Sequence, residues 1–207
     1  KVAIPHEDIR KGRLDPSVFA IDLGDVTMGG ASREYRDPER FFTRTYMTNG
    51  LKELLVRVLA TLYKKDTKGG AQRMAPVVQL VTPFGGGKTH SLLALYHLTR
   101  HYDKIKSLEQ IKDAVNKAGL ESVAKINVAC IDGTHLDPLL GDKKKEGISV
   151  RTLWGEMAYQ LGGPKLYEIV KEHDQKLVAP GKKRLREVLE KASPCLLILD
   201  ETLEYVV

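Results

Sequence analysis

The amino-acid sequence predicts an α/β fold of three layers, in which helices cover both faces of a mostly parallel sheet. The main observation is that short apolar runs of strand length alternate with longer segments of amphipathic helical periodicity. Parallel strands need long crossover connections, so this alternation is typical of a parallel sheet. The chain has 207 residues, of which 42% are hydrophobic and 29% charged, without an internal repeat. These values are those of one globular domain with its own core.

The chain divides at about residue 47. Residues 1–47 show no sustained period and carry turn signals at Gly24 and at Gly29-Gly30. We interpret this part as an irregular segment that packs on the core. Residues 48–207 are expected to form the core itself.

Helices and strands follow one another within the core. Apolar residues at helical spacing predict helices that stop at glycine or before proline, and aliphatic runs predict strands. Thr48 and Ser149 stand where N-caps are expected. The predicted helices cover 48–63, 90–101, 107–118, 149–161 and 180–192, Pro164 opens a further helix, and the predicted strands cover 77–81, 126–131 and 195–199.

A glycine-rich loop, TPFGGGKTH, lies between the first predicted strand and the helix after it. Glycines let backbone N–H groups approach phosphate oxygens, and the N-terminus of the following helix adds partial positive charge. Lys88 can then reach the β- and γ-phosphates, and Thr89 offers its hydroxyl to Mg²⁺. This is the P-loop, or Walker A, pattern. The residues expected to bind the nucleotide are Thr82, Pro83, Phe84, Gly85, Gly86, Gly87, Lys88, Thr89 and His90.

One position departs from the usual G-x-x-x-x-G-K-[ST] pattern, because Thr82 followed by Pro83 stands where the first glycine is expected. Proline favours an extended Thr82 and so prolongs the strand, while Gly85 and Gly86 supply the turn. The alternative is a glycine-rich surface turn without a ligand. The strand before the loop and the amphipathic helix after it favour phosphate binding.

An Asp-Glu pair, Asp200 and Glu201, follows the last predicted strand in the manner of a Walker B motif. A carboxylate at the carboxyl end of a strand beside the phosphate loop can hold Mg²⁺ through water, and we assign this role to Asp200. Glu201 is expected to polarise the attacking water as general base, with Lys88 as the other catalytic residue. The expected cofactors are thus ATP and Mg²⁺, with Thr89 and Asp200 at the metal. The alternative is a plain strand end.

The order of these features indicates a class of P-loop NTPase. One strand separates the glycine-loop strand from the Asp-Glu strand, as in the ATPases with an extra strand and a catalytic glutamate, which include AAA+ and RecA-like proteins. No Asn-Lys-x-Asp motif for reading guanine follows. We therefore expect a P-loop ATPase rather than a GTPase. A P-loop sheet of three strands is incomplete, so we expect further strands beyond residue 207.

Charge and cysteine content bear on partners and location. The formal net charge of +6 permits nucleic acid as a partner, and the basic clusters at 64–65, 143–145 and 182–184 are either solvated surface or contacts to it. No apolar run reaches the roughly 18 residues of a membrane span, so no membrane contact is expected. Cys130 and Cys195 lie in apolar runs, as free cysteines of reducing compartments do. We expect a cytoplasmic protein.

Three weaker signals have alternative interpretations. The stretch Ile21-Asp22-Leu23-Gly24 resembles the phosphate loop of actin-like ATPases, although a second phosphate system would be redundant. His97 and His101 have an i, i+4 spacing that can bind zinc, without an adjacent glutamate. Asp132 or Thr134, after the second strand, could line the site near the γ-phosphate.

Longer stretches of the sequence resemble a known family. They are SVFAIDL, YRDPERFFTRTYMTNGLKELL, TPFGGGKTHSLLALYH, TLWGEMAYQLGG and LLILDE, and they span most of the chain. On these stretches the sequence resembles the large prokaryotic ATPases catalogued as domain of unknown function 499, which occur among antiviral defence genes and sometimes beside DNA methyltransferases. In that family Thr82-Pro83 is a normal feature. The resemblance implies an AAA+-like ATPase in a longer polypeptide and supplies no substrate.

Phe41, Phe42 and Tyr46 have two interpretations. They precede the first core helix, where AAA+ proteins often contact adenine. The other interpretation is packing in the core.

The expected function is ATP hydrolysis by a motor or switch that rearranges a larger assembly in phage defence or on DNA. DNA or DNA-modification proteins are the expected partners, together with further copies in a homo-oligomer. A nucleotide-gated module with little hydrolysis and a nucleic-acid-binding domain are the alternatives. We expect residues 1–207 alone to turn over ATP weakly or not at all, because the sequence contains no recognisable arginine finger or sensor strand.

Overall fold

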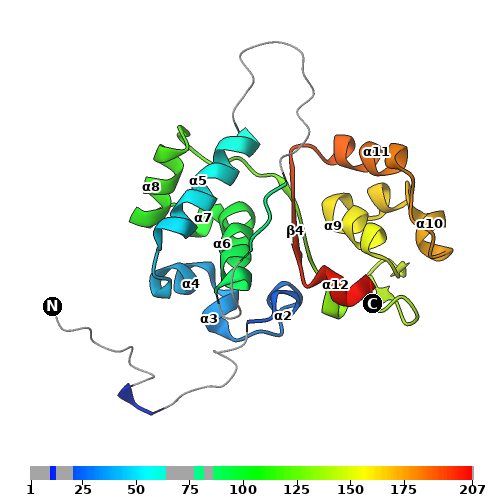
Figure 1. The fold of residues 1–207 in the computed structure, drawn as a ribbon, viewed down its shortest axis with the longest axis horizontal. Helices are drawn as coiled ribbons and strands as arrows, with labels where there is room; N and C mark the ends of the chain where they lie inside the picture. Colours follow the sequence, from blue (N-terminus) through cyan, green and yellow to red (C-terminus); the bar gives the residue numbers. More distant parts are fainter. Residues whose placement is uncertain (1–9, 13–20, 64–76, 82–85, 207) are drawn as a thin grey trace, which may run out of the picture.

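The structure is a computed structural model that describes residues 10–12, 21–63, 77–81 and 86–206. It is α/β, with a small parallel sheet and many helices (Figure 1). The helices are α2 (Leu23–Met28), α3 (Arg33–Arg36), α4 (Pro38–Arg44), α5 (Asn49–Tyr63), α6 (Lys88–Arg100), α7 (Tyr102–Ile105), α8 (Glu109–Lys117), the 3-10 helix η2 (Gly133–His135), α9 (Leu153–Tyr167), α10 (Lys171–Gln175), α11 (Lys182–Ala192) and α12 (Thr202–Val206). The strands are β1 (Asn127–Asp132), β2 (Asp142–Lys143), β3 (Ser149–Val150) and β4 (Cys195–Asp200). The predicted helices that correspond to α5, α6, α8 and α11 are confirmed, as are the strands β1 and β4.

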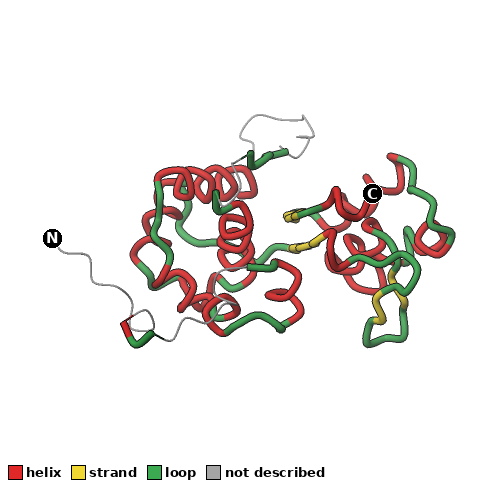
Figure 2. Tube along the Cα trace, turned by 60° about the horizontal axis from the view of Figure 1, so that its bottom comes forward, coloured by secondary structure: helices red, strands yellow, loops and turns green. Residues whose placement is uncertain are grey.

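Strands β1 and β4 form the parallel sheet, in a register that ends on the pair Asp132 and Asp200. Side chains of successive residues in a strand point to opposite faces. Val128 and Cys130 accordingly belong to one hydrophobic cluster, whereas Ala129 between them belongs to another. The sheet therefore lies between two groups of helices, as Figure 2 shows.

The first group of helices packs around α6, which contacts both strands. Leu93 and Leu98 of α6 are fully buried, and so are Leu55 and Leu59 of α5, which lie four residues apart on one helix face. Ile111 brings α8 into the same cluster. This layer holds the helix that follows the glycine-rich loop.

Residues 21–47 differ from the irregular segment that the sequence predicted, because they contain α2, α3 and α4. These helices are too short to show a clear period in the sequence. Asp37 caps α4 by accepting the N–H groups of the next turn. Phe41 and Phe42 are 2% and 0% exposed, so their packing in the core is confirmed. Tyr46, in contrast, is 86% exposed.

The second group of helices is α9, α10 and α11; α9 and α11 pack on the other face of the sheet, and α10 contacts α9. The anchor of this group is Asp174, which is fully buried and accepts hydrogen bonds from the N–H of Thr152 at 2.8 Å and the hydroxyl of Tyr167 at 2.8 Å. The predicted N-cap Ser149 lies instead in β3, and Thr152 caps α9. Ser149 is wrong as the cap because Val150 pairs in β3 before the helix begins.

The predicted strand at 77–81 is also wrong for the described structure. Val77 and Val81 are 92% and 80% exposed, and no backbone hydrogen bond joins 77–81 to β1 or β4 among the described residues. An extended segment becomes a strand only when a neighbour pairs with it. The predicted sheet of three strands is thus a sheet of two in the described part of the chain. The described residues therefore form an α/β fold with a small parallel sheet, which is less than a full three-layer P-loop core.

The outer edge of β1 is covered by a side chain. Gln160 of α9 accepts the N–H of Cys130 at 2.7 Å and donates to its carbonyl oxygen at 3.0 Å. These are the two bonds that a neighbouring strand would make. The Gln160 side chain therefore satisfies the backbone groups of Cys130 at this edge of β1.

None of the described helices has both the length and the apolar character needed to cross a membrane.

Candidate functional site

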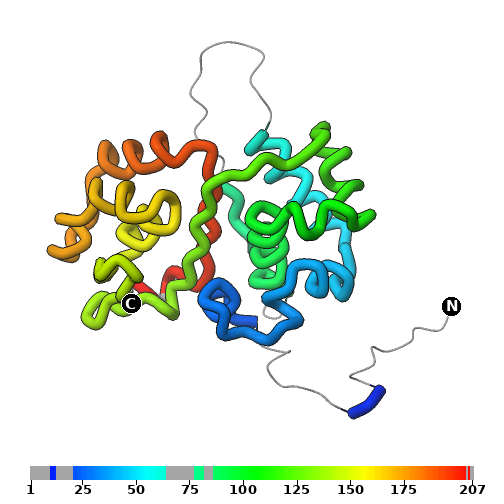
Figure 3. Tube along the Cα trace, turned by 180° about the vertical axis from the view of Figure 1, so that it is seen from behind, coloured from blue at the N-terminus to red at the C-terminus, as the bar shows by residue number. Residues whose placement is uncertain are grey.

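The carboxyl ends of β1 and β4 and the N-terminus of α6 meet at one end of the sheet. Residues Asp132 and Asp200 are paired at the ends of the two strands. Figure 1 and Figure 3 show α2 and α12 at this same end, and α2 contacts both β1 and α6. In open α/β sheets, ligands bind outside the carboxyl ends of the strands. A ligand site is therefore expected at this end of the sheet.

A hydrogen bond joins the two motifs that the sequence singled out. The hydroxyl of Thr89 donates to Oδ2 of Asp200 at 2.8 Å, although the two residues are 111 positions apart. Asp200 is only 8% exposed. A buried carboxylate needs hydrogen-bond donors or a cation, so this contact fixes both side chains. Two hard oxygen donors thus stand side by side, as a Mg²⁺ site requires.

The N-terminus of α6 is open to an anion. Its cap residue is Gly87, which has a φ of 77° and no side chain to bond the first N–H groups. Such uncapped N–H groups and the helix dipole attract negative charge. Gly86 and Gly87 are exposed, and Lys88 in the first turn is half-buried. The other predicted loop residues, Thr82, Pro83, Phe84 and Gly85, lie outside the described residues.

Glu201 follows Asp200 in an unusual backbone conformation. Its φ is 42°, in the left-handed region that residues with a side chain rarely adopt. Its N–H donates to Oδ1 of Asp200 at 3.2 Å, and its side chain is exposed. A Cβ added to Gly133 would overlap the carbonyl oxygen of Glu201. Gly133 therefore lets the Asp-Glu turn approach the end of β1.

His90 points toward the N-terminal helices. Its Nε2 lies 3.0 Å from Oγ1 of Thr45, and its ring is 4.5 Å from that of Phe41. Burial lowers the pKa of His90, so the neutral imidazole is favoured. The contact joins Thr45, at the end of α4, to the first turn of α6. Contact of His90 with a nucleotide stays a prediction.

Asp132 is held by its own turn. Its Oδ1 accepts the N–H of Thr134 at 2.9 Å and the hydroxyl of Thr134 at 2.7 Å, which caps η2. The neighbouring Cys130 is buried, and burial together with the charges of Asp132 and Asp200 raises the pKa of its thiol. The protonated thiol is therefore favoured. Whether Asp132 or Thr134 faces a γ-phosphate stays a prediction.

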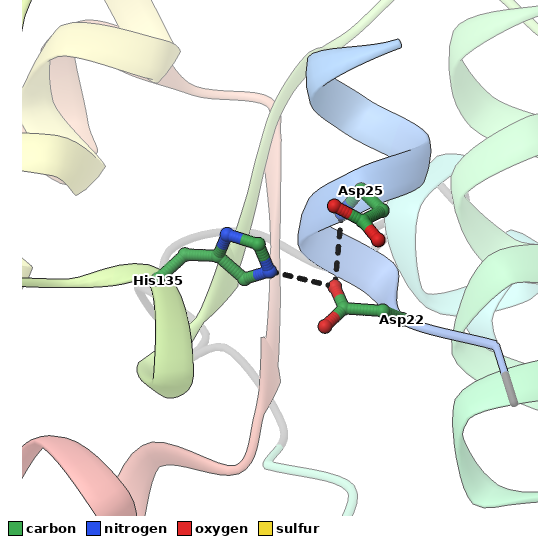
Figure 4. A group of neighbouring side chains, drawn as sticks. All are labelled: Asp22, Asp25 and His135. Carbon is green, nitrogen blue, oxygen red and sulfur yellow. Dashed lines mark hydrogen bonds and ion pairs between the residues drawn. The ribbon is translucent and has the colours of Figure 1, made fainter. Parts of the chain in front are cut away.

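A second polar cluster at this end of the sheet was not predicted. Figure 4 shows Asp22 and Asp25 of the α2 segment beside His135 of η2. Oδ1 of Asp22 lies 2.9 Å from Nε2 of His135 and accepts the N–H of Asp25 at 2.9 Å. The one sequence signal was Asp22 within the actin-like stretch, and nothing in the sequence linked it to His135. His97 and His101, whose spacing alone would allow zinc binding, are placed differently: His97 is buried, and its Nε2 lies 2.7 Å from the carbonyl oxygen of Tyr35.

Comparison with known proteins identifies the family. No curated protein matches the chain, and no solved structure matches it. One family model, the DUF499 N-terminal domain, matches residues 4–207 and thus almost the whole chain. The chain therefore belongs to the DUF499 family, domain of unknown function 499.

Proposed function

We propose that this chain is an ATP-binding and ATP-hydrolysing P-loop domain that uses Mg²⁺. The observation that carries the proposal is the hydrogen bond of 2.8 Å between Thr89 and Asp200. It joins the glycine-rich loop to the Asp-Glu pair, and these are the two parts that P-loop ATPases use on phosphate and metal.

Phosphate binding rests on the N-terminus of α6. Gly87 caps this helix without a side-chain bond, so the first N–H groups can turn to phosphate oxygens. Lys88 begins the helix and adds a full positive charge that can reach the β- and γ-phosphates. ATP rather than GTP is proposed because Glu201 directly follows Asp200, as in the P-loop ATPases with a catalytic glutamate.

The metal role rests on Thr89 and Asp200. The Thr89 hydroxyl and the Asp200 carboxylate would hold Mg²⁺ as hard oxygen ligands, the carboxylate through water. When bound there, Mg²⁺ would offset charge on the β- and γ-phosphates. Because Asp200 is buried, its charge needs such a partner or a hydrogen bond.

Hydrolysis is assigned to Glu201. Its carboxylate would accept a proton from water while the water oxygen bonds to the γ-phosphorus and the bond to the β,γ-bridging oxygen breaks. The products are ADP and inorganic phosphate. Glu201 is exposed whereas Asp200 is buried, so the two carboxylates lie in different surroundings, as two separate roles need.

The wider role follows from the family resemblance alone. We propose a motor or switch that rearranges a larger assembly in phage defence or on DNA. In that assembly, DNA, DNA-modification proteins or further copies of the chain would be the partners.

Two variants of the full-length protein test the proposal. Lys88→Ala should abolish binding of a fluorescent ATP analogue, whereas Lys112→Ala, an exposed lysine of α8, should not. Glu201→Gln should lower phosphate release by about 10²- to 10⁴-fold while ATP stays bound, because it removes the general base. Unchanged binding in Lys88→Ala would refute the phosphate site.

A second candidate is a nucleotide-gated module with little hydrolysis. The exposure of Glu201 favours it, because a general base usually needs a fixed position. An unchanged rate of phosphate release in Glu201→Gln, with ATP still bound, would favour this candidate. Competition between ATP and DNA, lost in Lys88→Ala, would instead favour a nucleic-acid-binding domain.

A further inference from the structure

We propose that Asp22, Asp25 and His135 form a binding site for a divalent transition-metal ion of the Zn²⁺ type. Each residue offers one ligand atom, and these three atoms all lie within 4.8 Å of one another. They come from two segments more than a hundred positions apart, since Asp22 and His135 differ by 113. The site is separate from Thr89 and Asp200 and does not depend on the proposed ATPase activity.

The absence of a side chain at Gly24 leaves space for the imidazole of His135. Gly24 lies in the first turn of α2, where a Cβ would overlap the ring of His135 at its Cδ2 and Nε2 atoms. Only a residue without a side chain lets the ring approach the helix so closely. Its Nε2 then faces Oδ1 of Asp22 at 2.9 Å. The ring therefore occupies one defined position beside both carboxylates (Figure 4).

The donor set selects the class of ion. One imidazole nitrogen with two carboxylate oxygens suits Zn²⁺ and its neighbours, whereas Mg²⁺ and Ca²⁺ prefer oxygen ligands alone. Three protein ligands leave a coordination position for water or another ligand. The His135 and Asp22 side chains are 27% and 39% exposed, so an ion can enter from solvent.

The negative charges around the His135 ring also favour a bound cation. Oδ1 of Asp22 accepts two hydrogen bonds, from His135 and from the N–H of Asp25, while Asp132 and Asp25 add negative charge near the imidazole. Although partial burial disfavours the imidazolium, Asp22 and the other carboxylates raise the pKa of His135, so a proton competes with a metal ion for this nitrogen. A divalent ion would replace that proton and offset more of the charge. Binding should therefore strengthen as the pH rises.

The ion would join two elements at the active end of the sheet. Asp22 caps α2, and His135 ends η2, whose Gly133 touches the backbone of Glu201. A bound ion would hold α2 against the end of β1. The expected consequence is a higher melting temperature, because the ion binds the folded chain only.

The test is titration of the full-length protein, freed of any affinity tag and of metal, with ZnCl₂ in a calorimeter. Co²⁺ absorption serves as the second readout. We expect one ion per chain, at least about tenfold weaker binding after His135→Ala or Asp22→Asn, and no binding of Ca²⁺ at the site. Asp25→Asn should weaken binding as well. Lys88→Ala should leave Zn²⁺ binding unchanged, which separates this site from the proposed nucleotide site.

Two glycine variants test whether a loss of Zn²⁺ binding comes from loss of the site or from loss of folding. Gly24→Ala changes no ligand but displaces the ring, so Zn²⁺ binding should fall as in His135→Ala. Gly50→Ala, in α5 with open space around it, should bind as the unchanged protein does. Circular dichroism of both checks the fold. Stoichiometric binding that survives His135→Ala would place the ion elsewhere, and the absence of micromolar binding would mean an ion pair without a metal; either result overturns the proposal.

Discussion

Two carboxylate clusters lie at the same end of the sheet and differ in almost every physical respect. In one, the buried Asp200 accepts a hydrogen bond from Thr89, and its residues belong to two motifs visible in the sequence. In the other, the half-exposed Asp22 and His135 come from isolated positions that only the fold brings together. The main difference between the two clusters is the burial of their carboxylates. A buried carboxylate is costly without partners, so its partners must be built into the motif.

The comparison predicts different responses to substitution. Loss of a group in the buried cluster leaves another polar group without a partner, and water replaces it poorly. Loss of a group in the exposed cluster leaves atoms that water can reach. The variants below test this contrast, from the largest expected effect to the smallest.

Asp200→Asn should have the largest effect. The substitution removes the negative charge that we propose binds Mg²⁺, and it changes the volume of the side chain little. We expect phosphate release to fall by about 10²-fold or more, the scale of losing one charge-stabilising group. Steady-state turnover with saturating Mg²⁺ and ATP measures it. Asp25→Asn, at the exposed cluster, is the control and should retain turnover; equal loss in both would break the distinction between the clusters.

Gly133→Ala should come next, because it pushes apart the ends of the two strands. An added Cβ would overlap the carbonyl oxygen of Glu201, which is backbone and cannot rotate away. We expect the free energy of unfolding to fall by up to about 3 kcal/mol, as in overpacked cores. Urea denaturation followed by circular dichroism measures this. Gly50→Ala has open space and should match the unchanged protein or exceed it by up to about 1 kcal/mol.

Thr89→Val isolates the hydrogen bond that joins the two motifs. Valine keeps the shape of threonine but cannot donate to Asp200. We expect a loss of about 1–2 kcal/mol in the free energy of unfolding without nucleotide, and no more, because Asp200 keeps the N–H of Glu201. Thr43→Val is the matched control, since this exposed hydroxyl bonds only to carbonyl oxygens of its own helix. Equal stability of the two variants would contradict the coupling.

The part of the fold that could be predicted is the part with a strong local pattern. Helices α5 and α6 and strands β1 and β4 carry sustained apolar periods, so their existence could be predicted from the sequence. The segment 77–81 has the same apolar character, but a strand also needs a paired neighbour, which no local pattern reveals. The short helices α2, α3 and α4 depend on caps and burial rather than on period.

The candidate site likewise has residues that could be predicted from a local pattern and residues that could not. Thr89 and Asp200 could be predicted because glycine spacing and an acidic strand end each indicate a role, and the structure brings them into contact. The cluster around His135 could not, because one histidine after a strand and one aspartate before a short helix have no shared pattern. Their meeting depends on the packing of α2 against β1 and on Gly24, which is a property of the fold.

His135→Gln should have the smallest effect, and it should depend on pH. Although partial burial disfavours the imidazolium, its hydrogen bond to Asp22 raises the pKa of His135 above the ordinary 6.5; despite burial, the N–H of Asp25 and the bond to His135 lower the pKa of Asp22 below 3.8. The pair therefore stabilises the fold fully between these two values, and the contribution fades as pH rises through the raised pKa of His135. We expect the unchanged protein to exceed the variant by less than about 1 kcal/mol at pH 5.5, because the pair is partly exposed. Urea denaturation from pH 5 to 9, with chelator present, measures the difference, which should shrink toward zero at the alkaline end. A constant difference across this range would mean that the imidazole acts by packing rather than by charge.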